Sequence, residues 1–285
     1  MRNTSADMCE GPLFGKIIRY TIPIILTGIL QLLFNAADLI VVGRFCGSVS
    51  VAAVGATGAL INLIINLFIG LSIGAGVAVA HGLGAGKDDE VSRTVHTAIP
   101  TAFFSGLILT VIGVLGTKQF LIFMGTPDDV IGLSALYMRI YFCGILGSML
   151  YNFGAAILRA AGETKGPLYY LTIAGVVNVI LNLIFVTVFH MDVAGVALAT
   201  AISQALSAAL VLLALSRRTD ACRLIFSKLH IYKSPLMQIV RIGLPAGIQG
   251  SLFSVSNVLI QSSVNSFGSV VMSGNAAAGN IEGFV

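Results

Sequence analysis

Three polar residues, Gln31, Asn35 and Asp38, stand inside the first long apolar run of this 285-residue chain. Their spacing of i, i+4 and i+7 places them on one face of a helix. Asp38 is the only carboxylate within the first seven apolar segments. A charge in a lipid-spanning helix costs roughly 2.5–3.5 kcal/mol even on a lenient insertion scale, so it is usually retained where it faces a polar cavity. We therefore expect this face to look into the interior of a helix bundle.

A carboxylate in that setting can bind a cation in two ways. It can take up a proton, because the desolvated anion is disfavoured, or it can stay ionised and hold Na⁺ among oxygen ligands. The candidate amides are Asn35 and, in a later apolar segment, Asn178 and Asn182 at i and i+4. Either cation neutralises Asp38 and biases the protein between two conformations only through its differential affinity for them. A lipophilic cation drawn to the same charge would compete with the ion.

Other buried amides have a simpler explanation. Interhelical hydrogen bonds, worth on average about 0.6 kcal/mol each, are a sufficient reason for such residues. For Asn62 and Asn66, also at i and i+4, we expect this structural role. For Asn178 and Asn182, a structural role and a cavity shared with Asp38 are equally compatible with the spacing.

Catalytic and metal sites are not indicated. The intramembrane carboxylate has no histidine or second aspartate near it in the apolar segments, because the four histidines fall at predicted helix ends or in loops: His81, His96, His190 and His230. The four cysteines have no paired spacing, so neither a metal site nor a disulfide framework is expected. The chain is therefore predicted not to be an enzyme and to need no cofactor besides a coupling ion, Na⁺ or H⁺.

The composition predicts an all-α polytopic membrane protein. Hydrophobic residues make up 56% of the chain and charged residues 10%, and the mean hydropathy is +0.96. Apolar windows long enough to cross a bilayer occur at about 17–42, 51–83, 95–115, 131–158, 168–189, 193–216 and 238–264, and an eighth begins near 270.

The positive charges predict the orientation of these helices. With the N-terminus inside, thirteen of the 16 Lys and Arg residues fall in cytoplasmic segments, and only Arg44 and Lys118 fall in external loops. The remaining one, Arg139, lies near the outer end of the fourth apolar window. The basic residues are dispersed at membrane edges, so nucleic-acid binding is not expected.

The second part of the chain repeats the first at an offset of 222 residues. Seven identities recur: Ile17, Arg19, Pro23, Gly28, Leu30, Asn35 and Phe45 match Ile239, Arg241, Pro245, Gly250, Leu252, Asn257 and Phe267. Asp38, however, aligns with Ile260. The second copy keeps a neutral stripe of Asn257, Gln261 and Asn265, so we expect ion chemistry in the first copy and a contribution of Asn257 and Gln261 to a substrate cavity.

A duplicated lobe explains the repeat. We expect a six-helix lobe at 1–216, a cytoplasmic linker at 217–237 and the start of a second lobe at 238–285, with helix 7 and part of helix 8. Because both copies enter the membrane from the same side, the lobes form a parallel repeat of the kind found in transporters. The run of apolar residues at 281–285 indicates that the chain is a truncated form of a twelve-helix protein.

Prolines and glycines mark points of bending and close contact. Pro23 and Pro245 occupy equivalent positions in the two copies, where a missing backbone donor permits a kink, and a hinge and a static bend are both compatible with them. Gly70 and Gly74 are expected to allow two helices to approach closely.

Several stretches resemble the multidrug and toxic compound extrusion (MATE) family. They are the runs from Gly28 to Asp38, from Val42 to Phe45 and from Leu158 to Pro167. The resemblance covers the whole chain and implies a twelve-helix, two-lobed exporter of the cell membrane that exchanges Na⁺ or H⁺ for organic, commonly cationic, compounds. It implies a monomeric multi-pass protein whose partners are small organic substrates and the bilayer.

The resemblance also implies roles for individual residues. Asp38 matches the acidic cation site of the first helix, and Asn178 matches an amide of the fifth. Asn182 stands where several prokaryotic members carry aspartate, which leaves Asp38 as the only full charge in the interior of this lobe. Glu282 is a candidate second acidic residue of the substrate cavity, with a helix-end salt bridge as the alternative. A flippase for lipid-linked saccharides is the alternative function, although Arg139 is the only basic residue clearly inside a helix.

Overall fold

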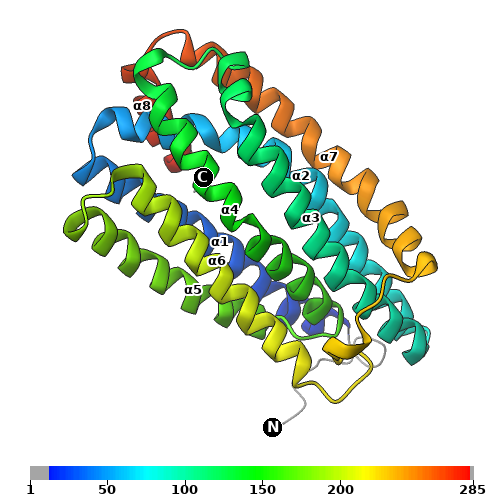
Figure 1. Cartoon of the computed structure of the whole chain (residues 1–285). Coiled ribbons are helices and arrows are strands. Elements are labelled where there is room, and N and C mark those ends of the chain that lie inside the picture. Colours follow the sequence, from blue (N-terminus) through cyan, green and yellow to red (C-terminus); the bar gives the residue numbers. More distant parts are fainter. Residues whose placement is uncertain (1–12, 283–285) are drawn as a thin grey trace.

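The computed structural model describes residues 13–282, which form long helices packed into one bundle (Figure 1). Residues 1–12, the start of the predicted first lobe, and 283–285, the end of the predicted part of the second, lie outside the described residues. The helices are α1 (Leu13–Phe45), α2 (Ser48–Gly84), α3 (Asp88–Phe123), α4 (Asp128–Ala160), α5 (Lys165–Leu183), α6 (Asp192–Ser216), α7 (Lys233–Asn265) and α8 (Ser269–Glu282). A π-helical turn, η1 (Ile184–Val188), extends α5, and a 3-10 turn, η2 (Phe226–Lys228), precedes α7.

Six helices, α1 to α6, are long and apolar enough to cross a membrane, with η1 completing α5. With no strand among residues 13–282, the predicted all-α polytopic fold is confirmed. α7 has 33 residues but is not among these six; polar residues occur along its whole length, from Gln238 and Arg241 to Gln261 and Asn265.

The turns that precede α2 and α8 share one local geometry. Gly47 has a φ of 95° and Gly268 a φ of 86°, and each is followed by the serine that begins the next helix, Ser48 or Ser269. Glycine adopts this backbone region without the penalty that a Cβ atom brings. α1 and α7 also have the same length, 33 residues. The sequence repeat is therefore matched by two helix pairs of similar local structure.

α2 and α7 lie side by side and cross with almost no space between their backbones (Figure 1). A Cβ atom at Gly70 would lie 2.3 Å from the backbone nitrogen of Gly247, and one at Gly74 would lie 2.3 Å from the carbonyl oxygen of Ile239. Two glycines on each helix make this approach possible: Gly243 and Gly247 of α7 lie against Gly70, and Gly243 also lies against Gly74. The predicted close contact at Gly70 and Gly74 is confirmed.

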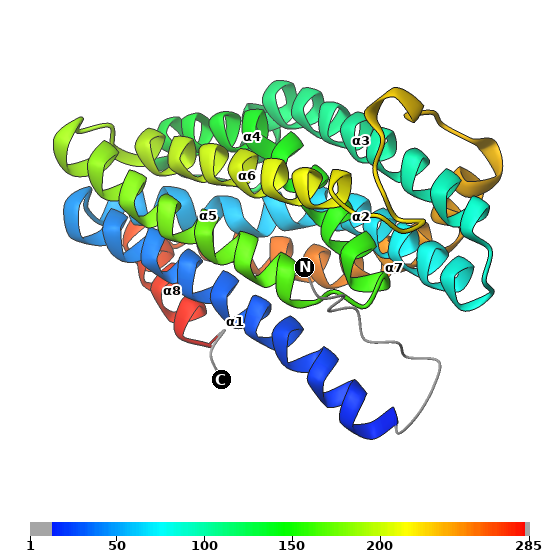
Figure 2. The same ribbon diagram turned by 90° about the horizontal axis from the view of Figure 1, so that it is seen from below.

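The two prolines lie inside continuous helices. Pro23 is in α1 and Pro245 is in α7, and each helix runs on past its proline. The hydroxyl of Thr27 donates to the carbonyl oxygen of Pro23 at 2.7 Å. The N-terminal end of α1 lies apart from the other helices (Figure 2). Its side chains are correspondingly exposed, as Phe14 and Ile17 show with 79% and 52% of their surface accessible.

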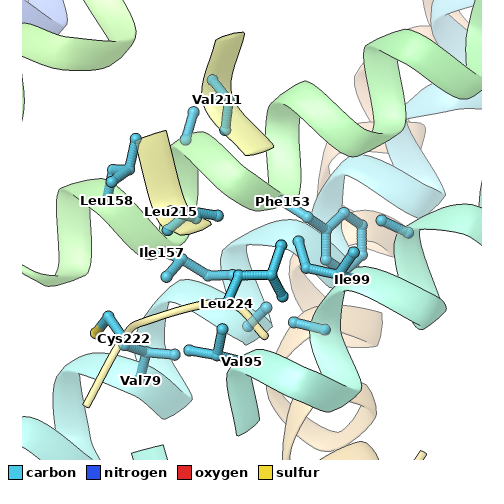
Figure 3. Close-up of a cluster of buried hydrophobic side chains, with 14 of the residues drawn as sticks. Val79, Val95, Ile99, Phe153, Ile157, Leu158, Val211, Leu215, Cys222 and Leu224 are labelled. Atoms are coloured by element: carbon cyan, nitrogen blue, oxygen red, sulfur yellow. The ribbon is translucent and has the colours of Figure 1, made fainter. Parts of the chain in front are cut away.

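The connection between α6 and α7 is packed into the bundle. Its Cys222 and Leu224 are buried among side chains of α2, α3, α4 and α6: Val79, Val95, Ile99, Ile157 and Leu215 (Figure 3). The ring of His96 accepts from the backbone N–H of Ile225 at 3.1 Å. The non-helical stretch ends at residue 232, because α7 begins at Lys233, five residues before the predicted apolar window. His96 is likewise not at a helix end or in a loop but buried inside α3.

Candidate functional site

Asp38 lies at the meeting point of three helices. α1 supplies the carboxylate, α5 supplies Asn178 and Asn182, and α6 supplies Thr200. The side-chain amide of Asn182 donates to Asp38 Oδ1, and the Thr200 hydroxyl lies 3.5 Å from Asp38 Oδ2. The sequence left open whether Asn178 and Asn182 have a structural role or share a site with Asp38; here Asn182 bonds to Asp38 and Asn178 bonds to Asn182.

The amides also bond to one another. Asn182 Nδ2 donates to Asn178 Oδ1 at 3.2 Å, and Asn178 Nδ2 donates to Thr200 Oγ1 at 3.3 Å. The Thr200 hydroxyl lies 2.9 Å from the carbonyl oxygen of Val196, so its single proton is shared between that oxygen and Asp38. Asn178 and Asn182 are 4% and 0% exposed, respectively. The four side chains thus form one connected polar network among apolar helices.

One acceptor in this network is unmet. The side-chain oxygen of Asn182 is buried and has no hydrogen-bond partner among the described residues. A buried polar group without a partner costs about 1–3 kcal/mol. The Asn182 amide meets this cost while its NH₂ group donates to both Asp38 and Asn178.

The oxygen atoms of the cluster suit a hard cation. Asp38 brings two, and Asn178, Asn182 and Thr200 bring one each. Carboxylate, amide and hydroxyl oxygens are the ligands that such ions prefer. The described residues hold no group of three or more His, Cys, Asp or Glu side chains, so a transition-metal site is not indicated there.

Asp38 also faces a cavity of about 580 Å³. Helices α1, α2 and α4 of the first repeat and α7 and α8 of the second enclose it. The polar and ionisable side chains that line it are Asn35, Asp38, Thr57, Asn62, Tyr137, Tyr141, Asn257, Gln261, Asn275, Asn280 and Glu282. It holds two carboxylates and, among the described lining residues, no Lys or Arg, so its electrostatic potential favours cations.

The cavity brings together most of the residues predicted for it. Asn35, Asn257, Gln261 and Glu282 line it with Asp38. Gln31 does not line it: it lies about 10 Å before Asp38 along α1, and its side chain is exposed, while its neighbours Leu30 and Phe34 pack against the buried core. Asn178 and Asn182 lie outside the lining: Asn182 bonds to Asp38, and Asn178 bonds to Asn182 and Thr200.

The two amides of α2 have separate roles. Asn66 donates to the hydroxyl of Ser254 on α7 at 2.7 Å, which is the predicted interhelical bond. Asn62 instead lines the cavity, although it was expected to share that structural role.

Sequence reasoning missed three other residues. Thr200 is a single hydroxyl in an alanine-rich run and gives no signal of its own. Tyr137 and Tyr141, whose ring centroids are 6.2 Å apart, form a stacked aromatic wall of the cavity from α4. Their i and i+4 spacing was available in the sequence, but such spacing is also typical of ordinary packing.

Known proteins resemble this chain in sequence and in fold. Residues 23–184 match the family described as MatE. The chain is 30% identical over 259 residues to the probable multidrug resistance protein YoeA of Bacillus subtilis, covering 88% of this chain and 56% of that protein. It is 27% identical over 288 residues to the probable multidrug resistance protein YpnP of the same organism, covering 98% and 62%. The chain thus spans about three-fifths of the length of these relatives.

Solved structures have the same arrangement of helices. An inward-facing MATE family transporter superposes with a TM-score of 0.81 at 23% identity, covering 93% of this chain and 61% of that one. A MATE crystal structure in a bent conformation gives 0.79 at 22% identity, covering 94% and 65%. The family match extends over more than half of the sequence and includes Asp38, Asn178 and Asn182. The chain therefore belongs to the MATE family of membrane transporters.

Proposed function

We propose that the protein is a secondary active antiporter that exports organic, often cationic, compounds in exchange for Na⁺ or H⁺, with Asp38 as the coupling site. The observation that carries this proposal is that the Asp38 carboxylate belongs to the polar network and also lines the cavity. Asp38 bonds to Asn182 and Thr200 on one side and lines the large cavity on the other. An ion bound there changes the charge of the cavity wall. Membership of the MATE family makes the chain a transporter component and not an enzyme.

The coupling step follows from the amide network. Asn182 and Thr200 donate to the carboxylate, and the side-chain oxygen of Asn182 is a buried acceptor available beside it. A proton or Na⁺ bound at Asp38 would remove the negative charge of this site. The loaded and unloaded sites would therefore differ in charge, which biases two conformations of the transporter if they differ in affinity for the ion.

The cavity chemistry supports organic cations as substrates. Asp38 and Glu282 supply negative charge, and Tyr137 and Tyr141 supply aromatic faces that attract cations. The relatives named probable multidrug resistance proteins agree with this class. A flippase for lipid-linked saccharides would need basic side chains to hold a pyrophosphate, and the described lining has none. This leaves the exporter as the better supported function.

Alternating access would come from two lobes moving around this cavity. We assign 1–216 to the first lobe, 217–237 to the linker and 238–285 to the start of the second, and the cavity lies where the two repeats meet. Pro23 and Pro245 are the proposed hinges. We further propose a monomer in the cell membrane with a cytoplasmic N-terminus, because most of the basic residues fall on that side.

Ion binding to the purified protein tests the coupling site. The melting temperature is measured in detergent with increasing NaCl against choline chloride at constant ionic strength, and separately from about pH 5 to about pH 8. If Na⁺ is the ion, NaCl raises the melting temperature of the wild type and of the control Glu282→Gln, but not that of Asp38→Asn. If H⁺ is the ion, only the pH dependence is lost in Asp38→Asn. An unchanged response of Asp38→Asn to both ions would overturn the assignment.

A further inference from the structure

A second hollow lies at the end of the bundle that carries the linker. It has a volume of about 530 Å³ and is separate from the Asp38 cavity, with which it shares no lining residue. α3 contributes Pro100, Phe103 and Phe104, and the linker contributes Phe226, Leu229 and Ile231. α4 and α6 close it with one leucine each. This groove, which we name the linker groove, is almost wholly apolar.

The linker groove opens onto the exposed apolar face of α3. Phe103 and Phe104 are 45% and 50% exposed, and Phe226 is 58% exposed. The same face of α3 continues with exposed Leu107 and Ile108 toward the middle of the membrane span. An apolar chain lying in the groove would therefore be continuous with the hydrocarbon of the bilayer.

The wall formed by the linker is held in place. Thr97 of α3 accepts from the backbone N–H of Tyr232 at 3.2 Å, and His96 accepts from that of Ile225 at 3.1 Å. Leu224, next to these residues, is buried in the core (Figure 3). Figures 1 and 2 both show the linker lying beside the first half of α3. These hydrogen bonds fix the linker against α3, so the linker wall of the groove is part of the folded structure.

Two basic residues, Lys228 and Arg93, neighbour the lining residues of the linker groove along the chain, and we call them its rim. Lys228 lies between the lining residues Phe226 and Leu229, and it is exposed. Arg93 stands seven residues before Pro100, on the same side of α3, and its guanidinium lies 5.9 Å from the ring centroid of Tyr232. Neither basic side chain has an ion-pair partner among the described residues.

The acidic residues at this end do not neutralise the rim. Asp88, Asp89 and Glu90 form the first turn of α3, and Asp89 and Glu90 stand four and three residues before Arg93, but neither forms an ion pair with it among the described residues. Glu90 is paired with Lys87 at 3.2 Å. In the linker, Asp220 bonds to Arg218, which also bonds to Glu163 of the α4–α5 turn at 2.7 Å. Lys228 and Arg93 therefore remain available to an anion.

We propose that the linker groove is a binding site for an anionic phospholipid. One acyl chain lies along Phe103, Phe104 and Phe226, and the phosphate is held between Lys228 and Arg93. An apolar groove that enters the membrane below two uncompensated cations matches the two parts of such a lipid, and basic residues at a membrane edge attract anionic headgroups. A zwitterionic lipid would fill the groove equally well but would gain little from the rim.

Photo-crosslinking tests the site and its charge preference. The wild-type protein is reconstituted in nanodiscs that contain a phosphatidylglycerol or a phosphatidylcholine with a diazirine in one acyl chain, at equal mole fraction. Labelled peptides are then located by mass spectrometry. We expect phosphatidylglycerol to label residues 99–104 and 226–231 in clear preference to phosphatidylcholine. Equal labelling by the two lipids, or no labelling of these peptides, would refute the proposal.

Matched variants separate charge from structure. Lys228→Gln and Arg93→Gln should each reduce the phosphatidylglycerol preference by about fivefold, and Arg93→Lys should keep it. Lys118→Gln, which removes an exposed charge at the opposite end of α3, should leave it unchanged. Helix content and elution volume report whether each variant is folded. A folded Lys228→Gln, Arg93→Gln double variant with the full wild-type preference would also contradict the proposed site.

Discussion

The substitution Gly70→Ala tests the close crossing of α2 and α7. The added Cβ atom would lie 2.3 Å from the nitrogen and 2.4 Å from the Cα of Gly247, and 2.5 Å from the carbonyl oxygen of Gly243. These are backbone atoms that cannot rotate away, and ordinary contact begins near 3.4 Å. The two helices must therefore separate by roughly an ångström at their crossing.

The expected cost can be estimated from two opposing effects. Overpacking of a well-packed contact costs about 1–3 kcal/mol, whereas replacing glycine by alanine inside a helix gains about 0.5–1 kcal/mol. The free energy of unfolding should fall by about 1–2 kcal/mol, which lowers the melting temperature by several degrees.

The control is Gly250→Ala on α7, where the nearest atom to the new Cβ is the Asn66 Cβ at 3.7 Å. There the substitution should be neutral or slightly stabilising. Thermal denaturation of both purified variants in detergent provides the measurement. A Gly70→Ala protein that melts at or above the wild-type temperature would show that the helices do not cross as closely as described.

Four further predictions follow from particular contacts. Thr200→Val keeps the shape of the side chain and removes the hydroxyl oxygen that lies beside Asp38. If Na⁺ is the coupling ion, the apparent Na⁺ affinity measured from the melting temperature in NaCl should weaken by roughly tenfold, and an unchanged affinity would show that Thr200 is not part of the site. Burial alone would raise the pKa of Asp220, but bonds to Arg218 and to the backbone N–H of Cys222 outweigh burial and lower that pKa. The stability that this pair contributes is present above the unfolded pKa of about 4 and is lost as pH falls through the lower folded pKa. In this pH range the free energy of unfolding of Asp220→Asn should therefore depend less on pH than that of the wild type. An impermeant thiol reagent should label Lys118→Cys on intact cells and Lys228→Cys only after permeabilisation, and the reverse pattern would invert the proposed orientation. Because the proposed transporter has two complete lobes, the 285-residue chain alone should insert without exporting dye, and gradient-driven efflux by it would refute the twelve-helix proposal.

The structure changes how thiols can report topology. Cys46 and Cys222 would be the natural reporters of the two sides, but Cys222 is fully buried in the core and cannot react in the folded protein. Burial, together with the neighbouring Asp192, raises the pKa of the Cys46 thiol to about 12, so little of it is the reactive thiolate at neutral pH. Introduced cysteines at exposed lysines avoid both problems.

The helices were predictable because hydropathy and glycine placement depend on local sequence. The predicted windows for 51–83, 168–189 and 193–216 agree with α2, α5 with η1, and α6 to within a few residues. The start of α7 was missed because Lys233 and Ser234 are polar, and hydropathy marks the membrane core of a helix and not its end. Pro235 is tolerated in the first turn, where helix backbone donors have no partner.

The site was only partly predictable because it is assembled from distant helices. Asp38 and the amides of α5 are conspicuous as charges and amides in apolar runs. Threonine and tyrosine are common in membrane helices, and only the tertiary structure brings Thr200 of α6 to Asp38 and the two tyrosines of α4 to the cavity wall. The absence of Gln31 from the cavity also depends on tertiary structure, since the cavity begins only at Asn35 along the same face of α1.

Gradient-driven efflux by an Asp38→Asn transporter is the most direct test of the coupling proposal. The protein, with a complete second lobe, is reconstituted in vesicles loaded with a fluorescent organic cation, and a Na⁺ or H⁺ gradient is imposed. The amide is nearly isosteric and removes a buried charge, so expression and folding should be retained. Efflux should collapse under both gradients, because the site no longer has a charge for either ion to neutralise. Wild-type, ion-coupled efflux by a well-expressed Asp38→Asn protein would contradict the account.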